Sequence, residues 1–467
     1  MKPSSFSRRQ FLGQANCALV SALPVMSTLM NLRMAGSAAA AEGDPEGFKA
    51  LVCLFLNGGN DSFNMLAPRG AAYPEYATVR GSIALPDNAA RAINPLNDAG
   101  RPLMVHPSLA GLQELFESEK LAFVANVGTL VEHVTKAQYN ASQQLPLGLF
   151  SHSDQTEQWQ TSLPDKRSGI GWGGRMADIL KEFNVQDKFS MNVSLAGSNV
   201  FQAGNTVAEY AIRDTGADGL FGYNSAFSTD SGQRLTQIRS AALDSQMALE
   251  YQNYFERSFS KSKKDAVAAY DTFTAATNVT LPASVTWPST PLADQLKMVA
   301  RTIAGKGGLG MKRMTFFVNY GGWDHHSGLL GLQAPMLQTV NDAVVAFYRT
   351  LIALGQQDEV VLYSASDFGR TLTSNSQGSD HAWGGHQFVL GGQVKGKRIY
   401  GQYPSLVQDN PLDVGRGRLI PTTSVDEFFA EMALWLGVRK TSLPLVLPNI
   451  ARFHSPASPV PPMGFLL

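Results

Sequence analysis

The chain has 467 residues, of which 44% are hydrophobic, and it carries 38 basic and 38 acidic side chains. The apolar content is ample for a large core, and the even charge balance argues against nucleic acid as the main partner. The chain has two cysteines, Cys17 and Cys53. Cys17 lies in a segment that we expect to be removed, which leaves Cys53 without an intramolecular disulfide partner. We therefore predict that Cys53 packs in the core.

The first 41 residues resemble a twin-arginine export signal. The motif Ser7-Arg8-Arg9-Gln10-Phe11-Leu12 precedes an apolar stretch and a run of small residues at 36–41. Removing residues 1–41 lowers the basic count from 38 to 34 against 38 acidic residues, so the mature chain is near −4. No later segment has the roughly 18 uninterrupted apolar residues that a membrane helix needs. We predict a periplasmic or secreted protein, exported by the twin-arginine translocase and without a stable membrane span.

About 425 residues remain after this signal, which suits either two domains or one large α/β domain with insertions. We predict a single domain over residues 42–467. Residues 198–235 are rich in Gly, Asn, Ser and Thr with weak periodicity, and residues 241–274 have a charged, helical pattern. We interpret the region at about 197–288 as an insertion or cap.

The apolar pattern predicts alternating strands and helices. Residues 48–56 form an apolar run typical of a strand buried on both faces, a helical pattern follows at 106–119, and a second buried strand follows at 121–128. This order predicts a βαβ unit. The later expected elements are a helix at 291–303, a strand at 313–319, a helix at 332–354, a strand at 359–364 and a helix at 426–436.

Three of these apolar strands are followed by an acidic residue: Asp61, Asp324 and Asp367. Ligands of open α/β sheets sit beyond the carboxyl ends of the strands, where three carboxylates would repel one another without a cation. Any single one of them could instead cap a helix. Four histidines lie near these residues in sequence, and oxygen and imidazole ligands suit a divalent metal. They are His325, His326, His381 and His386.

Six short motifs occur in a fixed order along the chain. They are Gly58-Gly59-Asn60-Asp61, His106-Pro107-Ser108-Leu109, Ser151-His152, Trp323-Asp324-His325-His326, Ser366-Asp367-Phe368-Gly369-Arg370-Thr371, and Asp380-His381 with Gly384-Gly385. Together they resemble a family of exported bacterial proteins of unknown function within the alkaline phosphatase superfamily. The resemblance covers essentially all of the mature chain. It implies an alkaline phosphatase-like α/β core, with a mostly parallel sheet, helices on both faces and a cap or insertion region.

The resemblance also implies a metal site, because members of that superfamily hold one or two divalent ions, often zinc, and cleave phosphate or sulfate esters. The implied ligands are Asp61, Asp324, His326, Asp367 and His381, with His386 next. Phe368 stands where the relatives carry a histidine, and the spacing from Asp324 to His326 is short. These departures favour one metal, or a site richer in oxygen that suits Mg²⁺, Mn²⁺ or Ca²⁺.

The candidate catalytic residues are Ser151 and His152. Ser151 would attack the ester at the start of a helix, whose N-terminus favours an anion, although Ser151 could also be only a helix cap. Arg370 suits bidentate binding of phosphate or sulfate, or else a salt bridge to a carboxylate at the sheet edge. We count Asn60 with Arg370 among the substrate-binding candidates.

We therefore predict metal-dependent hydrolysis of phosphate or sulfate esters, with Ser151 or a water molecule as the attacking group. The expected substrate is a small anionic ester or an envelope glycan. One alternative is a non-catalytic exported assembly factor that keeps the fold and a structural metal, which Phe368 favours. Another is a binding module for sugars or an envelope polymer.

Overall fold

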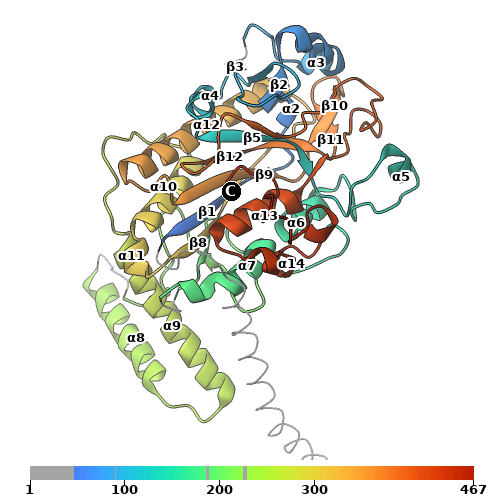
Figure 1. Cartoon of the computed structure of the whole chain (residues 1–467). Helices are drawn as coiled ribbons and strands as arrows, with labels where there is room; N and C mark the ends of the chain where they lie inside the picture. The colour runs from blue at the N-terminus through green and yellow to red at the C-terminus, as the bar shows by residue number, and fades with distance from the viewer. Residues whose placement is uncertain (1–46, 90, 186–188, 225–228, 467) are drawn as a thin grey trace, which may run out of the picture.

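The computed structural model describes residues 47–89, 91–185, 189–224 and 229–466 (Figure 1). The predicted export signal at residues 1–41 lies outside these ranges. Among the described residues, no helix combines the length and the apolar character needed to cross a membrane.

The centre of the molecule is a nine-stranded sheet. Its middle strand, β1 (Lys49–Asn57), runs parallel to both neighbours, β8 (Arg313–Gly321) and β9 (Val360–Ser366). One strand, β12 (Gly385–Gly391), runs antiparallel to the strands beside it. The remaining strands are β6 (Asn192–Ser194) and β7 (Tyr210–Ala211) beyond β8, and β5 (Leu121–Gly128), β13 (Ile399–Gly401) and β14 (Thr423–Ser424) beyond β12. The prediction of a mostly parallel sheet is confirmed.

Helices cover both faces of this sheet (Figure 1). On one face, α7 (Trp172–Leu180) and α13 (Val425–Leu436) stack Trp172 on Phe429 at 4.4 Å between ring centroids, over Tyr363 of β9. On the other, α10 (Pro291–Ala304) packs on β8 and on α12 (Leu329–Ala353), which contacts α4 (Ala110–Glu117). Because both faces are covered, the central strands are apolar almost without interruption.

The predicted βαβ unit is present with a wider crossover than the sequence order suggests. The strands β1 and β5 are parallel, but β9 and β12 lie between them in the sheet. The connecting helix begins at Ala110, later than the predicted start at residue 106, because His106 Nδ1 accepts the amide N–H of Ser108 in a turn before it.

Two small sheets and several short helices complete the core. β10 (Arg370–Ser374) and β11 (Ser379–His381) form an antiparallel pair. The other elements are β2 (Leu66–Pro68), β3 (Arg91–Ile93) and β4 (Leu103–Val105) in a three-stranded sheet, and the helices α2 (Ser62–Met65), α3 (Tyr73–Arg80), α5 (Lys136–Asn140), α6 (His152–Thr161), α11 (Lys306–Leu309) and α14 (Leu443–Val446).

Within the predicted insertion, α8 (Asp230–Ala248) and α9 (Tyr254–Thr277) form a hairpin that projects from the body (Figure 1). The sequence suggested one exposed helical stretch at 241–274, whereas the structure has two helices. Thr229 caps the first by accepting the Gly232 amide, and Asn253 caps the second by accepting the amides of Phe255 and Glu256. The cap at Asn253 lies within the predicted stretch and starts a new helix there, because its side chain satisfies amide groups that have no partner at a helix start.

Candidate metal centre

Four polar side chains gather at the carboxyl ends of β8 and β9. His152 is the first residue of α6, Asp324 follows β8, and His381 ends β11. One possible ligand atom from each of these three lies within 4.8 Å of the other two. His326 joins them, since its Nε2 lies 3.1 Å from Asp324 Oδ1 and 2.9 Å from His381 Nε2. We call these four residues the histidine cluster.

Each imidazole of the histidine cluster has its Nδ1 against an oxygen atom. An oxygen that only accepts requires a proton on the facing nitrogen, so each neutral ring presents the lone pair of its Nε2 to the interior of the cluster. The three pairs are His152 Nδ1 with Asp367 Oδ2 at 2.7 Å, His326 Nδ1 with Asp380 Oδ1 at 3.0 Å, and His381 Nδ1 with the Phe150 carbonyl oxygen at 2.9 Å.

This arrangement leaves the Nε2 atoms in need of a positive partner. The Nε2 atoms of His326 and His381 face each other at 2.9 Å, where two lone pairs repel. His152 Nε2 is buried, has no hydrogen-bond partner in the described part of the chain and lies 3.5 Å from Asp324 Oδ2. A metal ion with imidazole and carboxylate ligands resolves both conflicts, and the oxygen acceptors behind the rings are the usual support of metal-binding histidines. The residues present therefore fit a divalent metal.

Arg370 fixes the carboxylate of the cluster. Its guanidinium is fully buried and donates to Asp324, and to the carbonyl oxygens of Gly58, Gly59 and Ser379. Burial opposes ionisation of Asp324, but the hydrogen bond and the charge of Arg370 outweigh it and lower the pKa of Asp324. Arg370 thus holds Asp324 and the loop after β1, with its donors directed to the protein.

Phe368 forms an aromatic wall of the cluster. Its ring centroid lies 4.8 Å from that of His152 and 4.7 Å from that of His381. Gly59, at φ +77°, approaches the same ring so closely that a Cβ there would lie 2.4 Å from it. The glycine in the loop after β1 therefore leaves the space that Phe368 occupies.

Ser151 stands directly before His152, at the N-cap of α6. Its side chain makes no capping hydrogen bond to the helix, and its Oγ lies 3.2 Å from Ser153 Oγ. The preceding Phe150 has φ +71°, a conformation that costs free energy for a bulky side chain and that accompanies the contact of its carbonyl oxygen with His381. The start of α6 therefore offers amide groups without a side-chain cap beside the cluster, which suits an anion.

Two arginines stand near the cluster. Arg416 is half exposed and pairs with Asp380, while Arg418 lies over the Phe150 ring at 4.9 Å and donates to the His381 carbonyl oxygen. Burial alone would raise the pKa of Asp380. The hydrogen bonds from Asn375, His326 and Arg416 together outweigh burial and lower this pKa from its ordinary value to about 2. Asp380 is therefore an ionised acceptor that holds His326.

Three residues predicted for the site have other partners. Asp61 is buried and forms an ion pair with Arg80 at 2.6 Å, and it accepts from Ser379 Oγ. Asn60 is also buried, and its Oδ1 accepts from Gln333.

His386 is fully buried, and its Nδ1 accepts the amide N–H of Asn126 at 3.2 Å. Its ring stacks on Tyr403 at 4.7 Å. Burial lowers the pKa of His386 to about 3.

The structure therefore brings together His152, Asp324, His326 and His381, with Asp367 and Arg370 in direct contact with them. The sequence analysis included Asp380 in the Asp380-His381 motif but not among the predicted ligands, and the structure shows that it supports His326. The support of His381 by Phe150 was not predicted. Nothing in the sequence pointed to the Phe150 carbonyl, because a backbone contact does not depend on side-chain type.

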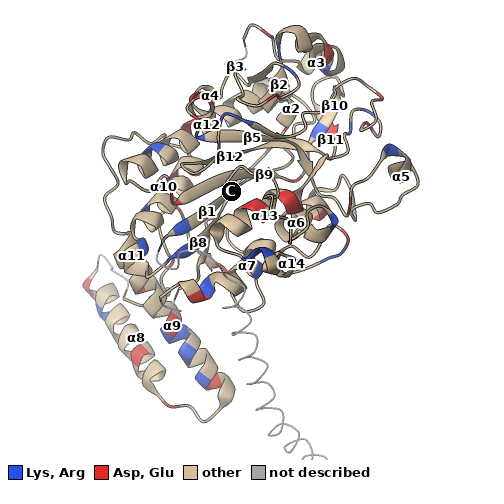
Figure 2. Cartoon of the chain, viewed as in Figure 1, with Lys and Arg blue, Asp and Glu red and all other residues tan. Residues whose placement is uncertain are grey.

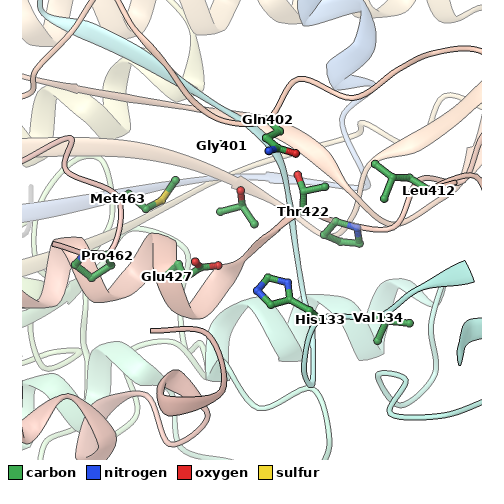
Figure 3. Close-up of a pocket in the computed structure, with 11 residues that line it drawn as sticks. His133, Val134, Gly401, Gln402, Leu412, Thr422, Glu427, Pro462 and Met463 are labelled. Atoms are coloured by element: carbon green, nitrogen blue, oxygen red, sulfur yellow. The ribbon is translucent and has the colours of Figure 1, made fainter. Parts of the chain in front are cut away.

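A separate hollow of about 500 Å³ lies between β13 and the start of α13 (Figure 3). Its lining includes His133, Gln402, Thr422 and Glu427. No residue of the histidine cluster lines it, so it is not part of the candidate metal centre.

The fold and the cluster define a mixed α/β protein with a candidate site for one divalent metal at the carboxyl ends of its central strands. A family model described as "Protein of unknown function (DUF1501)" matches residues 48–444, so the chain belongs to this family. This confirms the predicted membership in a family of unknown function. None of the curated proteins compared with the chain matches it.

Several solved structures resemble the chain distantly. Ps i-CgsB in complex with k-i-k-neocarrahexaose has a TM-score of 0.34 and 10% identity, over 88% of this chain and 78% of that one. The soluble domain of lipooligosaccharide phosphoethanolamine transferase A from Neisseria meningitidis has a TM-score of 0.32 and 10% identity, over 90% and 94%. A mutant of alkaline phosphatase PafA has a TM-score of 0.26 and 11% identity, over 70% and 64%. Scores of this size carry no function over to this chain.

Proposed function

We propose that this protein is a metal-dependent hydrolase of phosphate or sulfate esters. The observation that carries the proposal is the convergence of three imidazole Nε2 atoms on one carboxylate, at a site that is accessible to solvent. The side chains of Asp324 and His326 are 43% and 44% exposed, so a substrate can reach them. A purely structural metal site is closed, whereas a catalytic one keeps a position open.

His152, Asp324 and His381 would hold the metal, with His326 as a further ligand beside them. A nitrogen-rich set with one carboxylate favours zinc over Mg²⁺ or Ca²⁺, which prefer oxygen ligands. A divalent ion bound there acts as a Lewis acid that neutralises charge on an anionic ester.

The surrounding residues of the chain would orient the ester and its attacker. The start of α6 and the half-exposed Arg416 supply positive potential for a phosphate or sulfate group. Ser151, beside His152, is the candidate nucleophile, and its hydroxyl contacts the carboxylate of Asp154. Asp367 keeps the proton on Nδ1 of His152, and Arg370 positions Asp324.

The test combines metal analysis with an activity panel. Protein purified from its native export route should contain about one zinc per chain, and chelation should lower its thermal stability. It should hydrolyse one class among phosphate monoesters, phosphate diesters and sulfate esters. Absence of metal together with no response to chelator would overturn the proposal, and Ser151→Ala with unchanged turnover would remove Ser151 as nucleophile.

A second candidate is a non-catalytic assembly factor that retains the metal. The observation that favours it is Phe368, whose ring packs on two imidazoles and stands where the resemblance implies a histidine ligand. Stoichiometric zinc without turnover on any ester in the panel would support this candidate over the hydrolase.

The location that fits this proposal is the periplasm or the extracellular medium. It rests on the twin-arginine motif around Arg8 and Arg9. Replacing both by lysine should retain the protein in the cytoplasm, which cell fractionation measures. Unchanged export would contradict this route.

A further inference from the structure

The hairpin of α8 and α9 exposes a group of large apolar side chains at its free end. Leu249, Tyr254, Phe255 and Phe259 are 59%, 73%, 80% and 62% exposed. They lie in and just after the connection between the helices, which Figure 1 shows at the end farthest from the body. Burying such side chains is favourable, so a cluster of them at the end of a projection indicates an interaction surface.

One face of α9, which we call its apolar stripe, carries phenylalanines near the body and at the free end, with Ser262 and Ala266 between them. At its base, Phe273 is buried and stacks on Phe189 at 5.4 Å. Phe255 precedes Phe273 by about five helical turns, which places both on the same side of the helix and about 27 Å apart. The core of the protein covers the base of the stripe, whereas nothing in the described part of the chain covers its end.

Basic side chains surround the aromatic ones at the free end. Residues 249–265 contain three acidic side chains, Glu250, Glu256 and Asp265, and four basic ones, Arg257, Lys261, Lys263 and Lys264. Lys261 forms an ion pair with Asp265 at 2.6 Å, so Arg257, Lys263 and Lys264 are the basic groups that we assign to the surface. Figure 2 shows both basic and acidic residues along α9. Lys263 Nζ lies over the Phe259 ring at 4.6 Å, so aromatic and basic groups occupy the same surface.

We propose that residues 249–264 dock the protein on an anionic lipid surface, with Phe255 and Phe259 entering the headgroup region and the basic side chains contacting lipid phosphates. Helices that lie in a membrane interface combine Phe, Leu and aromatic side chains with Lys and Arg in this way. Anionic lipids attract such basic segments. A projecting end reaches a flat surface without contact between that surface and the body.

Two other exposed apolar residues allow an experiment to distinguish this occupant from a protein partner. Leu235 and Ile238 are 66% and 69% exposed, and they lie on α8 toward the body. A second copy or another protein packed along the hairpin would cover them as well. A lipid surface touches only the end.

The experiment is co-sedimentation of the full chain with vesicles of phosphatidylglycerol and phosphatidylcholine, or of phosphatidylcholine alone. We expect binding to the anionic vesicles that weakens at high salt. The double variants Phe255→Ser/Phe259→Ser and Lys263→Glu/Lys264→Glu should each bind roughly tenfold more weakly. The matched control Leu235→Ser/Ile238→Ser should bind as the unchanged chain does. Because all variants share the same N-terminal residues, those residues cannot cause a difference in binding between variants.

Thermal unfolding of each variant shows whether it is folded, because exposed substitutions should leave the midpoint unchanged. Equal binding by all variants, or no preference for anionic vesicles, would overturn the proposal. So would sedimentation equilibrium that shows a dimer lost in both the phenylalanine and the Leu235→Ser/Ile238→Ser variants, since that result assigns the surface to a second copy.

Discussion

Two sets of aspartate and histidine side chains follow the strands of this sheet, and they differ in what their neighbours supply. In the histidine cluster, the Nε2 atoms of the imidazoles around Asp324 converge on one another and on its carboxylate. In the buried set, Asp61 is neutralised by Arg80, and His386 sits neutral among aromatic rings. The comparison shows that residue type alone identifies only a possible metal ligand. The contacts of the side chain determine whether it is available to bind a metal.

The arginines act differently in the two sets. Arg80 pairs with Asp61 at full burial, so a metal bound to this carboxylate would have to compete with the guanidinium, although Asp61 Oδ1 has no hydrogen-bond partner among the described residues. Arg370 contacts Asp324 as well, but that carboxylate keeps contacts with three imidazoles and remains partly exposed. An arginine can therefore either occupy a carboxylate or only orient it.

The largest effect that the comparison predicts is loss of metal in Asp324→Ala. Removing the carboxylate on which the imidazoles converge should weaken zinc binding by more than the roughly 100-fold seen when only a supporting group is lost. Elemental analysis and titration with zinc measure this. His133→Ala, an exposed histidine outside the cluster, is the matched control and should retain the metal.

Asp61→Ala should lower the stability of the protein and leave its zinc content unchanged. It leaves Arg80 buried without its carboxylate, which should lower the free energy of unfolding by about 3–5 kcal/mol while the zinc content stays unchanged. Urea denaturation measures the free energy of unfolding, and metal analysis on the same sample measures the zinc content. Loss of zinc with unchanged stability would move Asp61 into the metal centre and erase the distinction between the two sets.

The buried set should also make stability depend on pH through His386. Its pKa in the folded protein is about 3, below the ordinary value of 6.5, so the unfolded chain binds more protons between these values. Stability is therefore present above about pH 6.5 and is lost as the pH falls toward 3, by about 3 kcal/mol at pH 4.

His386→Gln should remove that component, because an amide does not titrate and its oxygen can still accept from Asn126. The measurement is urea denaturation of both proteins at pH 7 and pH 4. Other groups titrate equally in both, so the difference between the two pH profiles isolates His386. Identical profiles would show that this histidine is not held neutral by burial.

The smallest predicted effect is that of Asp367→Asn. Asp367 supports His152 from behind, so its replacement should weaken zinc binding by about 10- to 100-fold and leave the stoichiometry near one at high zinc. Zinc titration against a competing chelator measures the change. An unchanged affinity would mean that His152 does not bind the metal through Nε2.

Much of the framework follows from local sequence. Continuous apolar runs predicted β1, β5, β8 and β9, because strands covered on both faces need apolar side chains throughout. Helical spacing predicted α10, α12 and α13 nearly to their observed bounds. The helix boundaries that were missed depend on caps and turns, such as the Ser108 contact with His106 before α4.

The sequence by itself determined the mostly parallel α/β sheet and the presence of acids and histidines after its strands, because both depend on short-range patterns. The tertiary structure decided which of them meet. Arg80 forms an ion pair with Asp61, which is 19 residues away in sequence. The carbonyl oxygen of Phe150 orients the imidazole of His381, which is 231 residues away. Such contacts arise only when distant segments pack together, so no local pattern records them.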